Sequence, residues 1–159
     1  MRAHRNFATD VSCNISDALY LIPWRDDWNK YSEFRVFVNE RKVTCLSQYI
    51  WHTAVGWNRK SIEIVAPRII DFCNNIARDF YLSSFVIDAI VVVKDPKYNN
   101  DMLIPIIDSA TEFDIELVEF NSFGAELSTS SALFHWLNDY DVMYESDEVV
   151  VRYTSNVDN

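Results

Sequence analysis

The spacing of apolar residues changes along the chain and divides it into strands and helices. Runs of β-branched and aromatic residues predict strands over Phe34–Val38 and Val43–Ile50. A polar turn at residues 39–42 separates the two runs, so they form a β-hairpin. An almost wholly apolar run over Phe85–Val93 predicts a strand that is buried on both faces. Strict alternation predicts a further strand over Phe113–Asn121.

Helical spacing occurs in two places. Between Ser61 and Tyr81 the apolar residues recur about every 3.6 positions, which predicts one long helix. Pro67 is expected in or near its first turn, where the missing N–H has little effect. A shorter helix is predicted over Thr129–Asn138. Its inward-facing residues would be Ala132, Leu133, Trp136 and Leu137.

Three shorter segments have strand-like composition. They are Ala18–Trp24, Met102–Ile107 and Glu148–Tyr153. A Pro- and Asn-rich loop is expected over Lys94–Asp101. The order of hairpin, helix, two long strands and second helix predicts the α+β class, with a mainly antiparallel sheet packed by helices.

The chain length favours one domain. It has 159 residues, of which 49% are hydrophobic, enough to build a core. We expect a polar N-terminal segment at 1–17, a folded lobe at 18–153 and a polar tail at 154–159.

The net charge of -10 limits the classes of partner. An acidic chain is repelled by nucleic acid and by anionic membranes, so neither is expected as a partner. The first residues lack the apolar run typical of a signal peptide, and no apolar run is long enough to cross a bilayer. A metal ion or a protein with a basic surface fits this charge better, and self-association is a further alternative.

The three cysteines, Cys13, Cys45 and Cys73, are odd in number and match no zinc-binding spacing. Cys45 and Cys73 lie in apolar patterns, which indicates buried free thiols. Free thiols are typical of a reducing compartment, so a cytoplasmic location is predicted.

Asp88 interrupts the most apolar run of the chain. Burying an unpaired carboxylate is expensive, so a cation or a hydrogen-bond network is expected beside it. A structural ion pair with Arg35 is one alternative, because Arg35 points to one face of the first hairpin strand. The same guanidinium could instead bind phosphate oxygens.

Glu119 and Asn121 end the strand predicted over Phe113–Asn121. Their odd numbering places them on the face of Phe113, Ile115 and Leu117, so this apolar face is expected to become polar at its end. A carboxylate and an amide directed to one side supply oxygen ligands, which suit Mg²⁺. The alternative is a strand end that simply begins a turn.

Five short motifs occur in an order that resembles one family. They are Glu33–Val38, Leu46–Tyr49, Phe85–Asp88, Val118–Gly124 and Ala132–Trp136. The set is similar to the cell-division-cycle one-two-three family of ATP-grasp-like proteins of cells and large viruses. The resemblance covers most of the chain, about residues 18–153.

The resemblance implies a fold like the C-terminal lobe of an ATP-grasp protein, with magnesium and ATP as ligands. By position, Asp88, Glu119 and Asn121 match the residues that hold magnesium against the phosphates. Arg35 matches a phosphate-side arginine, and Arg152 matches a second, later one. The N-terminal lobe, which carries the phosphate-binding lysine and the adenine hinge, has no usual counterpart in this sequence.

Three functions are compatible with this pattern. The first is an ATP- and magnesium-binding assembly chaperone or adaptor, acting on translation initiation factor two by analogy with the family. The second is an ATP-dependent carboxylate ligase that uses the same metal site. The third is a degenerate lobe that binds protein and has lost nucleotide binding.

Overall fold

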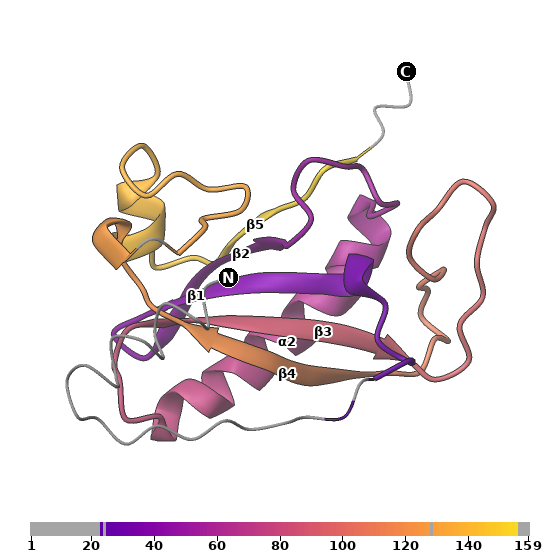
Figure 1. Ribbon diagram of the computed structural model, residues 1–159, viewed down its shortest axis with the longest axis horizontal. Coiled ribbons are helices and arrows are strands. Elements are labelled where there is room, and N and C mark those ends of the chain that lie inside the picture. Colours follow the sequence, from indigo (N-terminus) through magenta and orange to yellow (C-terminus); the bar gives the residue numbers. More distant parts are fainter. Residues whose placement is uncertain (1–22, 24, 128, 156–159) are drawn as a thin grey trace, which may run out of the picture.

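The computed structural model describes residues 23, 25–127 and 129–155, which form a five-stranded sheet with a long helix on one face (Figure 1). The strand order is β4-β3-β1-β2-β5. β2 and β5 are parallel, and the other neighbouring strands are antiparallel. The predicted α+β class and mainly antiparallel sheet are therefore confirmed. The strands are β1 (Glu33–Asn39), β2 (Lys42–Gln48), β3 (Phe85–Val93), β4 (Phe113–Asn121) and β5 (Val150–Arg152).

The hairpin of β1 and β2 closes through a two-residue turn. Glu40 and Arg41 both have positive φ, at 48° and 66°, which is the geometry of a type I′ turn. The strain of these non-glycine residues is offset because the Arg41 side chain donates to the carbonyls of Ala77, Arg78 and Phe80. These carbonyls lie at the C-terminal end of the long helix, where a cation is favourable.

The long helix, α2, spans Arg59–Asp79, as the spacing predicts. A capping box formed by Asn58 and Ser61 starts it. The expected position of Pro67 is wrong, because this residue lies inside the helix and not near its first turn. Pro67 is exposed, so water can reach the carbonyl of Glu63 that its missing N–H leaves free.

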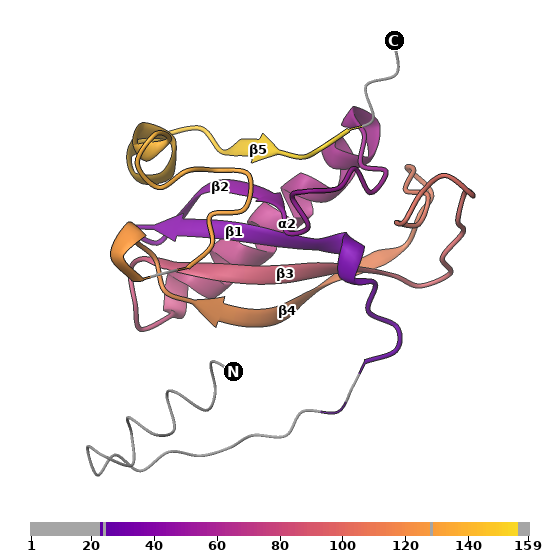
Figure 2. The same cartoon turned by 45° about the horizontal axis from the view of Figure 1, so that its top comes forward.

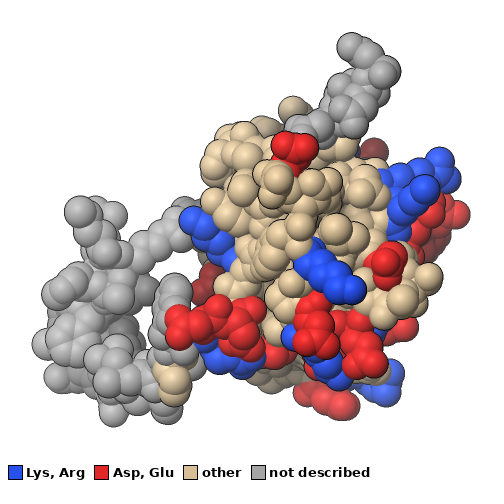
Figure 3. All heavy atoms as spheres, turned by 90° about the vertical axis from the view of Figure 1, so that its right-hand side faces the viewer, with Lys and Arg blue, Asp and Glu red and all other residues tan. Residues whose placement is uncertain are grey.

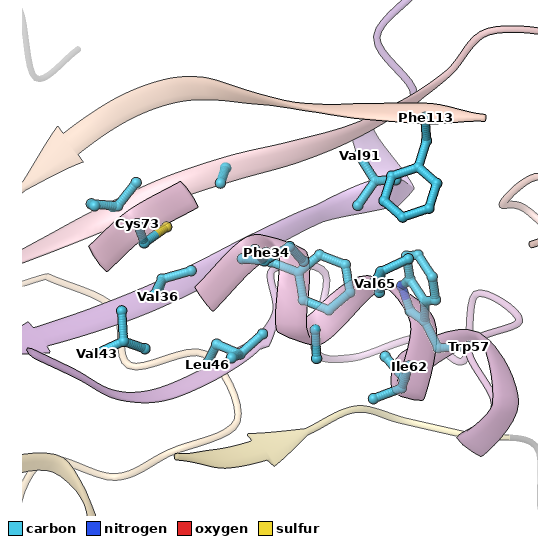
Figure 4. Close-up of a cluster of buried hydrophobic side chains, with 14 of the residues drawn as sticks. Phe34, Val36, Val43, Leu46, Trp57, Ile62, Val65, Cys73, Val91 and Phe113 are labelled. Atoms are coloured by element: carbon cyan, nitrogen blue, oxygen red, sulfur yellow. The ribbon is translucent and has the colours of Figure 1, made fainter. Parts of the chain in front are cut away.

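Most of the core lies between α2 and the sheet. Figure 4 shows this layer, in which Phe34 and Val36 of β1 and Leu46 of β2 face Val65 and Cys73 of α2. A second, smaller cluster lies on the opposite face of the sheet. Its members are Phe37, Cys45, Val86, Phe134, Trp136 and Met143. The predicted burial of β3 on both faces is thereby confirmed, since residues 85–91 are all buried.

The second cluster is covered by the segment between β4 and β5. This segment contains two short helical turns, η2 (Ala125–Leu127) and η3 (Asp141–Glu145), and a further turn, η1 (Lys30–Ser32), precedes β1. In Figure 2 the segment crosses over β1 and β2 on the side away from α2.

The predicted helix over Thr129–Asn138 is wrong. Ala132 has a φ of 51°, a left-handed conformation that ends helical geometry. The Ser131 hydroxyl donates to the carbonyl of Phe134, and the Trp136 indole donates to the carbonyl of Thr129, so local hydrogen bonds replace a helical ladder. Trp136 is buried as expected, but Leu137 is 72% exposed.

Residues 102–107 also differ from the prediction, since they form an irregular loop and not a strand. Isolated backbone hydrogen bonds hold the loop, from Leu103 to Val55 and from Ile106 to Lys97. Pro105 cannot donate to a strand ladder, and burial of Ile104 explains the apolar pattern without a strand.

The remaining predictions concern the ends of the chain and the cysteines. β5 is shorter than the strand predicted at Glu148–Tyr153, and the strand predicted at Ala18–Trp24 lies outside the described residues apart from Pro23. Cys45 and Cys73 are buried free thiols, as predicted, and Cys13 lies outside the described residues. Within the part of the chain that the structure describes, no helix is long and apolar enough to cross a membrane.

Candidate functional site

A polar row crosses the sheet on the face opposite α2. Directly opposed residues on neighbouring strands share a face, so the pairing register identifies the row. One residue of each strand contributes to it. In spatial order these are Glu119, Asp88, Arg35, Ser47 and Arg152.

Glu119 reaches this row because β4 contains a bulge. Asp88 lies opposite Glu119 and Ala89 lies opposite Leu117, so Val118 has no partner of its own. The extra residue reverses the alternation. The expectation that Glu119 and Asn121 share the face of Leu117 is therefore wrong, because the bulge moves both to the face of Asp88.

Arg35 and Asp88 form a buried, bidentate ion pair. Arg35 Nε donates to Asp88 Oδ1 at 2.8 Å, and Nη2 donates to Oδ2 at 2.6 Å. The two residues are 3% and 0% exposed. Burial raises the pKa of Asp88, and the hydrogen bonds and charge of Arg35 act in the opposite direction. The ion pair weighed in the sequence is therefore present, and it orients Asp88 rigidly.

Asn121 joins the two carboxylates. Its Nδ2 donates to Asp88 Oδ2 at 2.9 Å and to Glu119 Oε1 at 3.0 Å. The structure thus brings together the three residues that the sequence singled out as magnesium ligands.

The chemistry of this cluster suits a hard cation. The amide nitrogen of Asn121 lies between two carboxylate oxygens, where positive charge is stabilised. Rotation of the amide would present its oxygen instead, giving two carboxylates and one amide as ligands. Among the described residues no group of three or more His, Cys, Asp or Glu could hold a metal, so phosphate oxygens or water would have to complete the coordination.

Arg152 lies in the same row but has different partners. Its guanidinium donates to Asp139 Oδ1 at 2.6 Å and Oδ2 at 2.8 Å, and to the carbonyl of Leu133 at 3.1 Å. It also lies over the ring of Phe134, 4.4 Å from the centroid. The hydrogen bond from Arg152 lowers the pKa of Asp139. Ser47 lies between Arg152 and Arg35 across the sheet. The described contacts of Arg152 are with residues of the 133–139 segment, which they support.

Three further neighbours of the cluster were not among the candidate site residues. The ring of Tyr49 lies 4.8 Å from the guanidinium of Arg35, and the carbonyl of Ser130 accepts from Arg35 Nη1 at 2.7 Å. Glu33 lies two residues before Arg35 on β1, so the two side chains share a strand face. This spacing is the signal in the sequence that could have identified Glu33. Burial, together with the charges of Asp88 and Glu119, raises the pKa of Glu33 to about 7.

The raised pKa of Glu33 predicts a pH-dependent stability. Between pH 4.5, the ordinary pKa, and about 7, the unfolded chain ionises Glu33 while the folded chain retains its proton, so stability falls as pH rises. Glu33→Gln should remove this fall and stabilise the protein above pH 7 by about 1–2 kcal/mol, allowing for partial exposure. Urea unfolding across this range would measure it.

Glu148→Gln, at an exposed position, is the matched control and should leave the pH profile unchanged. A wild-type free energy of unfolding that does not change between pH 4.5 and about 7 would contradict the proposed effect of burial on Glu33.

A separate hollow lies in the loop that joins β3 and β4. Its volume is about 340 Å³, and its lining includes Asp95, Lys97, Asp108 and Glu112. None of the residues of the polar row lines it, so it is distinct from the Asp88 cluster.

Comparison with known structures identifies the class of this fold. Truncated Cdc123 from Schizosaccharomyces pombe matches with a TM-score of 0.55 at 16% identity, covering 92% of this chain and 50% of that chain. A second structure of Cdc123 from the same organism matches with a TM-score of 0.55 at 17% identity, covering 91% and 53%. The chain therefore has the α+β fold of these Cdc123 structures.

The family follows from the sequence model. The D123 model matches residues 4–159, so the chain belongs to the D123 (Cdc123) family. It spans about half the length of the solved relatives that it matches. The comparison with curated proteins gives no match.

Proposed function

We propose that this chain binds magnesium and ATP and acts as part of an assembly chaperone or adaptor. The observation that carries the proposal is the meeting of Asp88, Glu119 and Asn121 on one face of the sheet. These side chains would hold the ion, and the nucleotide phosphates would complete its coordination. Arg35 would fix the orientation of Asp88 and contribute positive charge beside the phosphates.

Membership of the family supports the chaperone or adaptor role. A client of the translation initiation factor two type is proposed by analogy alone. The net charge of -10 favours a client with a basic surface and disfavours nucleic acid or an anionic membrane as partner. A cytoplasmic location, inferred from the free thiols, belongs to the same proposal.

One observation favours the degenerate, protein-binding alternative. The Arg35 guanidinium already donates to Asp88 and to the carbonyl of Ser130, so a phosphate would have to compete for it. The ligase alternative has no comparable support among the described contacts.

Calorimetric titration of MgATP and MgADP into the full chain tests nucleotide binding. Glu119→Gln should weaken MgATP binding by about 10- to 100-fold, because it removes a charged ligand. Glu119 is exposed, so this variant should fold normally. Asp114→Asn, also exposed on β4 and on the same face, is the matched control and should bind as the wild type does.

The absence of heat with folded wild-type protein would reject nucleotide binding by this chain and favour the protein-binding alternative. Equal MgATP affinity of Glu119→Gln and the wild type would show that the nucleotide binds away from the Asp88 cluster. Phosphate release that depends on a carboxylate acceptor would favour the ligase.

A further inference from the structure

β4 forms one edge of the sheet. It is the terminal strand in the order and is nine residues long. Among the described residues, no hydrogen bond from another backbone segment reaches its outer edge, although the Arg68 guanidinium donates to the carbonyl of Phe113 at 2.7 Å. A free edge presents a row of N–H and C=O groups that can pair with another extended chain.

β4 carries part of the usual protection of such an edge, in its bulge at Val118 and its acidic side chains, but not all of it. Lysine and proline commonly block edge strands, and Phe113–Asn121 contains neither, nor any arginine. Its charges are all acidic: Asp114, Glu116 and Glu119 lie on the face opposite α2. Figure 3 views the end of the sheet where β4 begins, and most of the Asp and Glu side chains there gather in the lower half.

The other face of β4 is apolar and partly open to solvent. Leu117 is 36% exposed and Phe120 is 39% exposed. Phe120 stacks on Phe80 with ring centroids 4.4 Å apart, and the exposed Tyr81 and Leu82 extend the same apolar area. The edge therefore offers acidic groups on one side and apolar groups on the other.

The chain itself shows which side chains suit the acidic side. Arg25 Nη1 and Nη2 donate to the two carboxylate oxygens of Glu116 at 2.8 and 2.9 Å. The indole of Trp28 donates to the same carboxylate at 3.2 Å. The Glu116 carboxylate therefore binds a guanidinium of this chain, and a basic side chain of a partner would have to compete with Arg25 for it.

We propose that the β4 edge binds an extended segment of a partner protein in which basic residues alternate with apolar ones. Backbone pairing would add the segment as a sixth strand, with its basic side chains beside Asp114 and Glu116 and its apolar side chains beside Leu117 and Phe120. A second copy of this chain fits less well, because each copy carries a charge of -10 and the same acidic edge. This surface does not depend on nucleotide binding.

A synthetic peptide tests the proposal. It has about seven residues, with Lys or Arg alternating with Val or Ile. The comparison peptide has the same composition with its basic residues contiguous. The alternating peptide should bind the full chain at least about tenfold more tightly and should slow amide exchange along β4.

Leu117→Lys should abolish this binding, because a lysine on the edge repels the basic segment. Leu137→Lys, at a site that is 72% exposed and outside β4, is the control and should bind normally. Unchanged amide exchange in α2 would show that both variants are folded.

Three results would overturn the proposal. Equal affinity for the two peptides would indicate simple charge attraction. Protection of the outer β4 amides in the free monomer would show that this chain already covers the edge. Protection of the β4 amides from exchange that increases with protein concentration would show that the edge pairs with a second copy of this chain.

Discussion

Replacing Arg35 by Met should lower the free energy of unfolding by about 3–5 kcal/mol at neutral pH. The substitution leaves the carboxylate of Asp88 fully buried without its cation, with the hydrogen bond from Asn121 but without the two from Arg35. Urea unfolding of the wild type and variant would measure the difference.

The deficit of Arg35→Met should depend on pH. Burial raises the pKa of Asp88, and without Arg35 this effect is less opposed, so the carboxylate takes up a proton as the pH falls. The loss of stability should therefore be smaller at about pH 5 than at about pH 8.

Two further variants separate charge from packing at this site. Arg35→Met combined with Asp88→Leu should recover much of the loss, because an apolar pair can replace a buried ion pair. Arg59→Met breaks an exposed pair with Glu63 and should change stability by less than about 1 kcal/mol. A deficit below about 1 kcal/mol for Arg35→Met would contradict the structural importance of the pair.

Replacing Trp57 by Ala should destabilise the protein by about 3–5 kcal/mol. Trp57 is 1% exposed and packs against Phe34 at a centroid distance of 4.9 Å, between α2 and the sheet. The loss combines the transfer of apolar surface with the cavity that remains, and thermal unfolding would report it.

Trp57→Phe is the informative control. The indole Nε1 is buried and has no hydrogen-bond partner among the described residues, so its removal relieves an unsatisfied polar group. The smaller ring retains most of the contact with Phe34, and we expect a loss of about 1 kcal/mol or less. A loss as large as that of the alanine variant would imply that the indole nitrogen is bonded after all.

Much of the sheet could be predicted from sequence because its strands have strong local signals. β1, β2, β3 and α2 follow from alternation, apolar runs and helical spacing. The 129–138 segment could not be predicted because its apolar residues pack through tertiary contacts. The left-handed Ala132 and the bond from Trp136 to Thr129 leave no periodic signal.

The sequence singled out the residues that the structure brings together around Asp88, but not their geometry. Asp88 stood out as a charge in an apolar run, and Arg35 as its partner. The face of Glu119 was mispredicted because a bulge at Val118 shifts the register, and a single inserted residue does not alter the apolar pattern. Glu33 was not singled out because its raised pKa comes first from burial and then from the charges of Asp88 and Glu119, both of which arise only in the folded sheet.

The most direct test of the central claim is to locate a divalent ion in the folded chain in the presence of ATP. Mn²⁺ can replace Mg²⁺ at oxygen sites, and it broadens the NMR signals of nearby amides. If Asp88, Glu119 and Asn121 hold the ion, low Mn²⁺ with ATP should broaden their amides first, and Glu119→Gln should reduce this effect. Broadening centred on the 95–112 loop, with the Asp88 region unaffected, would contradict it.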